Sequence, residues 1–415
     1  MALSVPVTIK TTEHGGNGRF DYAVSAMQGY RENMEDAHAI VLDLDAATAT
    51  SFFGVYDGHG GPAVAKYCAK HLHIELLKFQ EFHDNLPYAV ERTFLRMDEM
   101  LRDRRAGWEL SKYGGNEQWK KYRRNLLTSC FLPLCVQRPA YAGPVGDGCT
   151  ACVALIRGNQ IIVGNAGDSR CVLSRNGQAI ELSTDHKPNL PAETQRIQDA
   201  GHEVAMSNRG NIHRIDDGIA ISRAIGDLRY KDNANLSPQN QAVTALPEVR
   251  SEEITDDTEF LVIACDGIWD CMTSQQLVNY VTIYMNNNVD LWRICESLLS
   301  HCLAQPRGKD NMSVILVRFN KPAEGRPVHQ RVAGHPGVLS SNAPAAAVAP
   351  SAPQHAAGHP GALSSSIVLP PPPNVEHTVS SAPPSVNLGG ADAGPIAGGV
   401  YDQLPETQRS KSSEL

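Results

Sequence analysis

Short apolar runs separated by glycine-rich turns dominate the first three quarters of the chain. Runs rich in valine, isoleucine and phenylalanine are typical of buried β-strands. They predict strands at 51–56, 151–156, 160–163, 171–173, 260–264 and 313–319. Only Arg157-Gly-Asn159 separates the second run from the third, which predicts a hairpin.

Stretches with helical spacing lie between these runs. They predict helices at 61–77, 88–104, 192–200, 274–285 and 291–304. The helix at 192–200 has a proline at its start and Gly201 at its end, which are common helix boundaries. Hairpins with separate helices favour an α+β layered fold over a parallel β-α-β sheet. Residues 105–148 are interpreted as an irregular insertion.

The composition changes near residue 320. The segment 321–415 holds 15 of the 26 prolines and has no cysteine, tryptophan or phenylalanine. Such a Pro/Ala/Ser/Gly-rich segment cannot bury enough apolar surface to offset its ordering entropy, so we predict a disordered tail. A repeat at 333–341 and 357–365 is interpreted as duplication without function, with a partner-docking motif as the alternative.

The expected organisation therefore has three parts. They are an N-terminal arm at 1–19, a globular domain at 20–320 and the tail at 321–415.

Charge and hydropathy exclude several classes of protein. A formal net charge of −8 gives no support to a nucleic-acid partner or an anionic membrane surface. No apolar run approaches the length of a membrane span, and no secretory signal is visible at the start of the sequence. The ten cysteines lie mostly in apolar runs and are expected to be reduced thiols. We therefore expect a monomer in the cytoplasm, the nucleus or both.

Acidic residues gather at the ends of the apolar runs, often beside glycine. They are Glu35, Asp36, Asp57, Asp168, Asp266 and Asp310. A carboxylate in such a place is costly unless it is paired, hydrogen-bonded or bound to a metal. Each one alone is more simply explained as a turn residue, but together they favour a site for hard ions such as Mg²⁺ or Mn²⁺.

Several nucleophile motifs are absent from the sequence. It has no Gly-x-Ser-x-Gly elbow, no Cys-x5-Arg phosphate loop and no Walker A lysine loop. Because no side-chain nucleophile stands out, a metal-activated water is the expected nucleophile.

The acidic residues and their neighbours lie in seven motifs that resemble, in order, those of the metal-dependent protein phosphatase 2C family. The motifs are Arg31-Glu-Asn-Met-Glu-Asp-Ala37, Phe52-Phe-Gly-Val-Tyr-Asp-Gly-His-Gly-Gly61, Gly148-Cys-Thr-Ala151, Gly167-Asp-Ser-Arg170, Ile221-Ser-Arg-Ala-Ile-Gly-Asp227, Ala264-Cys-Asp-Gly-Ile-Trp-Asp270 and Lys309-Asp-Asn-Met-Ser313. The resemblance implies a four-layer α-β-β-α sandwich with two central antiparallel sheets. It also implies hydrolysis of phosphoserine and phosphothreonine in phosphoprotein substrates, with two Mg²⁺ or Mn²⁺ ions and a weaker third.

The resemblance also implies roles for individual residues. The implied metal ligands are Glu35, Asp36, Asp57, Gly58, Asp168, Asp266 and Asp310, with Asp57 bridging two ions and Asp168 near the third. A water bridging the two ions attacks the phosphate, which Arg31 binds as a bidentate fork. His59 is implied as the general acid and Thr150 as a hydroxyl that lines the substrate site.

Two other interpretations use different chemistry. Val41-Leu-Asp-Leu-Asp45 resembles the nucleophile loop of haloacid-dehalogenase-type phosphatases, with Asp216 and Asp217 as distal acids, but residue 47 is alanine where that loop has threonine or valine. An inactive phosphatase-like binding module is disfavoured, since every acid of the implied metal site is present.

Overall fold

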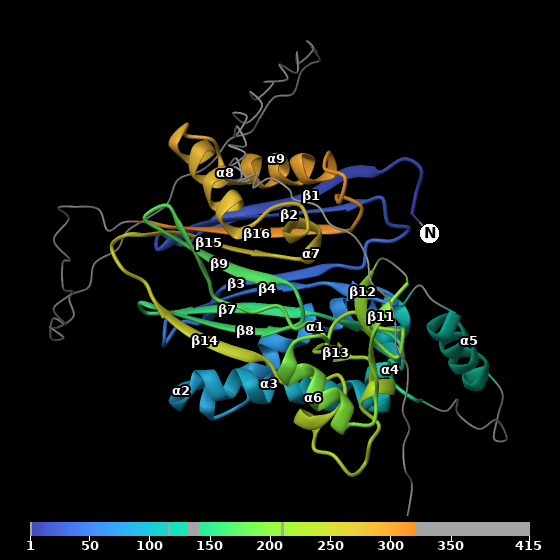
Figure 1. Ribbon diagram of the computed structural model, residues 1–415. Coiled ribbons are helices and arrows are strands. Elements are labelled where there is room, and N and C mark those ends of the chain that lie inside the picture. The colour runs from blue at the N-terminus through green and yellow to red at the C-terminus, as the bar shows by residue number, and fades with distance from the viewer. Residues whose placement is uncertain (1, 115–116, 132–140, 209–210, 321–415) are drawn as a thin grey trace, which may run out of the picture. The chain divides into compact units, whose positions relative to one another are not determined.

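The computed structural model describes residues 2–114, 117–131, 141–208 and 211–320 (Figure 1). Within these residues, two central antiparallel sheets are packed face to face, with helices on both outer faces (Figure 1). The predicted α+β class and four-layer sandwich are therefore confirmed. The tail predicted at 321–415, with its repeat, lies outside the described residues.

One central sheet has the strand order β1-β2-β16-β15-β9-β10. Its strands are β1 (Val7–Gly16), β2 (Phe20–Gly29), β9 (Arg170–Arg175), β10 (Gln178–Glu181), β15 (Thr258–Ala264) and β16 (Met312–Phe319). β16 lies between β2 and β15, so the start and the end of the domain share one sheet. Most of the predicted N-terminal arm is the edge strand β1, which pairs with β2.

The other central sheet has the order β14-β8-β7-β4-β3. Its strands are β3 (Ala37–Asp45), β4 (Thr50–Tyr56), β7 (Ala151–Arg157), β8 (Gln160–Ala166) and β14 (Glu248–Glu253). β7 and β8 form the predicted hairpin, and Gly158 supplies the left-handed backbone at its turn, with φ of +58°. β4 is buried along its whole length, which explains its unbroken apolar run.

Helices cover the outer faces of both sheets (Figure 1). The helices are α1 (Ala63–Leu76), α2 (Glu81–Asp84), α3 (Leu86–Arg102), α4 (Arg104–Tyr113), α5 (Glu117–Phe131), α6 (Pro191–Asp199), α7 (Asp266–Trp269), α8 (Ser274–Asn286) and α9 (Leu291–Leu303), with 3-10 turns η1 (Leu228–Tyr230) and η2 (Pro238–Asn240). α1 and α3 pack on the five-stranded sheet, and α8 and α9 pack on the six-stranded sheet. No helix among the described residues is long and apolar enough to cross a bilayer.

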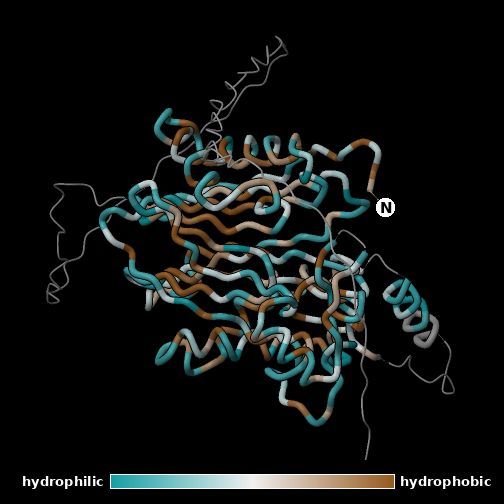
Figure 2. Tube along the Cα trace, viewed as in Figure 1, coloured by the Kyte–Doolittle hydropathy of each residue, from teal (hydrophilic) through white to brown (hydrophobic). Residues whose placement is uncertain are grey.

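Buried apolar residues lie between the two sheets and between the five-stranded sheet and its helices. Figure 2 shows hydrophobic positions concentrated along the central strands. Phe20 and Phe53 meet edge to face between the sheets, with ring centroids 5.7 Å apart. This packing fixes the two sheets against each other, and the loops at their ends are held by a rigid core.

The insertion at 105–148 is not irregular throughout, contrary to the sequence interpretation. It contains most of α4 and all of α5, and the described residues at its end continue into β6. Leu110 and Trp119 are almost completely buried against the helical layer. The apolar stripe is narrow among many charged residues, so the helical pattern was easy to miss.

Two small sheets complete the described fold. They contain β5 (Gly58–His59), β6 (Gly148–Cys149) and β13 (Ile225–Gly226) in one case, and β11 (Val204–Ser207) and β12 (Ile212–Ile215) in the other. β6 lies between β5 and β13, so the segments around His59 and Gly226 are held side by side.

Candidate active site

The pairing of the strands places the ends of several of them at one edge of the sandwich. Ala37 at the start of β3 lies opposite Tyr56 at the end of β4. Ala264 at the end of β15 lies opposite Val314 near the start of β16. The loops at these strand ends, together with the loop after β8, carry Glu35, Asp36, Asp57, Asp168, Asp266 and Asp310. We refer to these six residues as the acidic cluster.

Members of the acidic cluster lie close together at positions that are half-buried or buried. A carboxylate oxygen of Asp36, one of Asp57 and the Sγ of Cys265 all lie within 4.8 Å of one another. Burial, followed by the negative charge of Asp266, raises the pKa of Asp57 well above its usual value. Burial raises the pKa of Asp266 in the same way, and the charges of Asp168 and Asp310 add to the effect.

Asp36 has a buried oxygen whose hydrogen bonding is incomplete. Its side chain is buried, and burial raises its pKa to about 6. The hydroxyl of Ser313 donates to Asp36 Oδ2 at 2.7 Å, but Oδ1 has no hydrogen-bond partner among the described residues. A buried carboxylate oxygen without a donor is costly, so a hydrogen-bond donor or a cation placed at Oδ1 would be stabilising.

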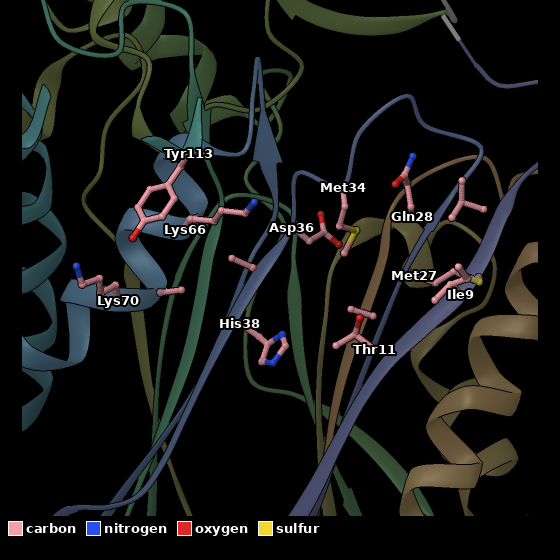
Figure 3. Close-up of a pocket in the computed structure, with 14 residues that line it drawn as sticks. Ile9, Thr11, Met27, Gln28, Met34, Asp36, His38, Lys66, Lys70 and Tyr113 are labelled. Atoms are coloured by element: carbon pink, nitrogen blue, oxygen red, sulfur yellow. The ribbon is translucent and has the colours of Figure 1, made fainter. Parts of the chain in front are cut away.

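Asp36 also lines a groove of about 660 Å³ between β1 and β2 on one side and β3, α1 and α4 on the other (Figure 3). Ile9 and Met27 form an apolar wall, and Lys66 and Lys70 lie across from them (Figure 3). The groove therefore gives access to the side of the acidic cluster that Asp36 forms.

The loop that carries Glu35 is held against two other segments. A Cβ on Gly58 would lie 2.3 Å from the Glu35 carbonyl oxygen, so only glycine permits this approach. The backbone N–H of Glu35 donates to Asn311 Oδ1 at 2.9 Å, and Asn311 Nδ2 donates to the carbonyls of Gln28 and Asn33. Asn311 therefore fixes the position of Glu35 relative to its own neighbour Asp310.

His59 forms an ion pair at the edge of the cluster. Its Nε2 lies 2.5 Å from Oδ2 of Asp227, whose side chain is almost completely buried. Burial alone would lower the pKa of His59, but the charge and the hydrogen bond of Asp227 outweigh it, so the pKa of His59 is raised. His59 therefore holds a proton near neutral pH more readily than a free histidine does.

Two basic side chains contact members of the acidic cluster. Arg31 forms an ion pair with Asp310, and its side chain remains 54% exposed. Lys187 forms an ion pair with Asp168. Burial opposes the charge of Lys187, but Asp168 outweighs it and the pKa of Lys187 is raised. Lys187 therefore compensates the charge of Asp168 directly.

Thr150 contacts the backbone of Asp57. The N–H of Asp57 donates to Thr150 Oγ1 at 3.1 Å, and the N–H of Thr150 donates to the Asp57 carbonyl at 2.8 Å. Thr150 is 2% exposed, and its hydroxyl also bonds Ser169 at 2.8 Å. These contacts orient Asp57 and leave little of the hydroxyl open to a ligand.

Four further residues help to build the site, and none of them was a candidate from the sequence. They are Lys187, Asp227, Cys265 and Asn311. Asp227, Cys265 and Asn311 lie inside the seven motifs, so motif membership was a usable signal. Lys187 lies outside them, and only its contact with Asp168 reveals it.

The acids of the haloacid-dehalogenase alternative have other roles in the structure. Asp43 is an exposed residue of β3. Asp216 bonds His202 at 2.6 Å, and Asp217 bonds Ser207, both in the turn after β12. The structure therefore gives no support to that nucleophile loop.

Comparison with known proteins identifies the class and then the family. Two crystal structures from Toxoplasma gondii share the fold: a phosphatase with a TM-score of 0.58 and 24% identity, covering 75% of this chain and 96% of its own, and a serine-threonine phosphatase 2C with a TM-score of 0.56 and 20% identity, covering 75% of this chain and 100% of its own. The protein phosphatase 2C profile matches residues 20–117 and 137–312.

Curated relatives match over more than three quarters of the chain. "Probable protein phosphatase 2C 42" of Oryza sativa subsp. japonica is 57% identical over 326 residues, which cover 78% of this chain and 91% of the relative. "Probable protein phosphatase 2C 60" of Arabidopsis thaliana is 44% identical, with 77% and 92% covered. The chain belongs to the protein phosphatase 2C family and is a protein serine/threonine phosphatase.

Proposed function

We propose that the acidic cluster holds two Mg²⁺ or Mn²⁺ ions and that the enzyme uses them to hydrolyse phosphoserine and phosphothreonine in phosphoproteins. Family membership implies a metal-dependent phosphatase with phosphoprotein substrates. The observation that carries the proposal is the close approach of Asp36 and Asp57, since a carboxylate oxygen of each and Cys265 Sγ lie within 4.8 Å of one another. The pKa values of the half-buried Asp57 and Asp266 are raised well above their usual value, which supports it.

The residues present fit this pair of ions. The donors are hard oxygens, the type that Mg²⁺ and Mn²⁺ prefer. Asp36 Oδ1 is buried without a donor, and Asp57 and Asp266 repel each other. Cations bound here would relieve both costs, because each cation offsets the negative charge and gives the oxygens a partner.

We assign the ligands as the family resemblance implies. Glu35, Asp57, the Gly58 carbonyl, Asp266 and Asp310 would hold the two ions with support from Asp36, and Asp168 would serve a weaker third. The ion pair between Lys187 and Asp168 supports weak binding at that third position, because a cation must compete with the ammonium group.

When bound, divalent cations supply an activated water and neutralise charge on the phosphoryl oxygens. Arg31 is half exposed and can leave Asp310 to bind the phosphate as a fork. His59, whose pKa Asp227 raises, donates its proton to the leaving serine or threonine oxygen. Thr150 holds the backbone of Asp57 in place and is proposed as a positioning residue.

The test is phosphate release from a phosphoserine and a phosphothreonine peptide with Mg²⁺ or Mn²⁺ titrated into chelator-treated protein. We expect turnover to rise with each metal and to vanish in excess EDTA. Asp43→Asn, which changes an exposed acid outside the cluster, is the matched control and should behave like the unaltered protein. Full turnover in EDTA would contradict the metal assignment. Monomeric state, cytoplasmic or nuclear location and partner docking through the tail stay predictions.

A further inference from the structure

Two cysteine thiols meet where α7 and α9 approach each other. Cys271 lies two residues after α7, and Cys302 lies in the last turn of α9. Their thiols hydrogen-bond each other, and Cys271 Sγ lies 3.6 Å from the Cys302 carbonyl oxygen. Among the cysteines of the described segments, Cys271 is partly exposed and the others are buried.

The two thiols have different chemical character. The hydrogen bond from Cys302 lowers the pKa of Cys271 despite burial, and the charge of Arg307 acts in the same direction. The same hydrogen bond and burial raise the pKa of Cys302. Cys271 is therefore the accessible nucleophilic thiol, and Cys302 is a protonated thiol within its reach.

We propose that Cys271 and Cys302 form a reversible disulfide when the protein meets hydrogen peroxide, and that this disulfide lowers phosphatase activity. The Cys271 thiolate attacks one peroxide oxygen, the O–O bond breaks, and the departing oxygen leaves as water after taking up a proton. The Cys302 sulfur then displaces the hydroxyl of the Cys271 sulfenic acid as a second water. Both sulfurs are oxidised, and the peroxide is reduced.

The position of Cys271 connects the pair to the acidic cluster. Cys271 Sγ lies 3.4 Å from the carbonyl oxygen of Gly267, which follows Asp266. Gly267 packs closely on the segment that carries Asp310: a Cβ on Gly267 would lie 2.0 Å from the Asn311 carbonyl oxygen. A movement of Cys271 would therefore shift the contact between Gly267 and Asn311, the residues that follow Asp266 and Asp310.

Cys302 connects the cysteine pair to the segment that carries Asp310. The Cys302 carbonyl accepts from the N–H of Gln305 at 2.9 Å, and a Cβ on Gly308 would lie 2.0 Å from that carbonyl. These residues lead directly into Asp310. A disulfide holds its two sulfurs about 2.05 Å apart, so closure would constrain the segments on which Cys271 and Cys302 lie relative to each other.

The effect on activity rests on the metal-binding roles proposed for Asp266 and Asp310, whereas formation of the disulfide does not. The experiment therefore measures the two separately. Full-length protein with Mg²⁺ is exposed to hydrogen peroxide, its free thiols are blocked with N-ethylmaleimide, and unreduced digests are examined by mass spectrometry. Turnover of p-nitrophenyl phosphate is measured before exposure, after exposure and after dithiothreitol.

We expect a peptide linked through Cys271 and Cys302, loss of most of the turnover, and recovery of both thiols and turnover with dithiothreitol. Cys271→Ser and Cys302→Ser should form no linked peptide and keep most of their turnover at the same dose. Cys295→Ser, a buried change on the same helix as Cys302, should respond like the unaltered protein. Cys68 and Cys149 also hydrogen-bond each other but are fully buried, and they should stay reduced.

Three results would overturn the proposal. They are absence of the linked peptide, formation of it without loss of turnover, and equal loss of turnover in Cys302→Ser. An untreated protein that hydrolyses no phosphate with Mg²⁺ or Mn²⁺ would contradict the metal-dependent function instead, while the linked peptide could still be measured.

Discussion

His59 Nε2 and Asp227 Oδ2 lie 2.5 Å apart. They can approach this closely because Gly148 of β6, the strand between β5 and β13, has no side chain. A Cβ on Gly148 would lie 2.1 Å from Asp227 Oδ2 and 2.7 Å from His59 Nε2. Asp227 itself has a left-handed backbone, with φ of +50°, which is costly for a residue other than glycine. The fold therefore holds this pair together despite the conformational energy cost at Asp227, as expected for a pair that orients a proton donor.

Replacement of His59 should separate two kinds of substrate. A serine alkoxide needs a proton to leave, whereas p-nitrophenolate leaves readily without one. His59→Gln should therefore slow phosphopeptide hydrolysis on the order of 10²-fold and p-nitrophenyl phosphate much less. The kcat of both substrates on one preparation provides the measurement, and equal losses would remove the general-acid role.

Replacement of Asp227 should move the pH profile. Asp227 raises the pKa of His59, so the protonated form of His59 persists to higher pH. In Asp227→Asn this support is lost, and the alkaline fall in kcat/KM for a phosphopeptide should begin at lower pH. The profile for p-nitrophenyl phosphate should change less. An unshifted phosphopeptide profile would show that the pair is only structural.

Removal of one charge from the acidic cluster should abolish turnover yet stabilise the metal-free protein. The raised pKa of Asp57 and of Asp266 means that the folded state disfavours their ionised forms, so stability without metal falls as pH rises above their unfolded pKa values. Asp57→Asn should have a higher Tm than the unaltered protein in EDTA at neutral pH. Scanning calorimetry in EDTA gives the comparison, with Asp43→Asn as the control; a lower Tm would argue against repulsion in the cluster.

Glu193 should be a major source of stability in the segment that carries Asp227. Its buried carboxylate accepts from Arg196 and Arg223 at 2.7 Å each and from the Ser222 hydroxyl at 2.6 Å. Removing one partner from a buried ion pair costs about 3–5 kcal/mol, so Glu193→Gln should lower the free energy of unfolding by that order. Glu99→Gln breaks an exposed pair with Arg96 and should cost about 0–1 kcal/mol.

The contribution of Glu193 to stability should depend on pH. Burial opposes ionisation of Glu193, but Arg223 and Arg196 outweigh it and lower its pKa from 4.5 to about 2. Its contribution to stability is therefore complete above pH 4.5 and is lost as the pH falls toward 2. Denaturant titrations of the unaltered protein and of Glu193→Gln should converge over this range. A constant difference down to pH 2 would contradict the assigned shift.

The sequence was a good guide wherever local pattern and packing agree. Buried runs such as 51–56 and 260–264 predicted their strands, because an unbroken apolar run is what a central strand needs. β1 was missed because Ile9 is exposed and the strand is held by backbone pairing with β2 rather than by burial. Pairing partners are not encoded in local hydropathy, so an edge strand of this type is hard to recognise.

Local sequence likewise reveals only part of the active site. The acidic cluster could be proposed from the position of each acid at a strand end, and its members do lie at one edge of the sandwich. The contact between His59 and Asp227 spans 168 residues, and the contact between Cys271 and Cys302 spans 31. Neither spacing corresponds to a local motif, so three-dimensional structure was needed to find them.

The insertion of β16 between β2 and β15 sets the order in which this enzyme can assemble. β2 cannot complete its pairing until the chain has been made as far as Phe319, because Phe319 pairs with Phe20. Contacts across such long separations form slowly, since the intervening loop must be closed first. Glu35 is held by Asn311, a contact that spans 276 residues, so the site cannot form on a partly synthesised chain. The nascent protein is therefore inactive until β16 emerges from the ribosome, and until then the edges of β2 and β15 are open to pairing with other chains.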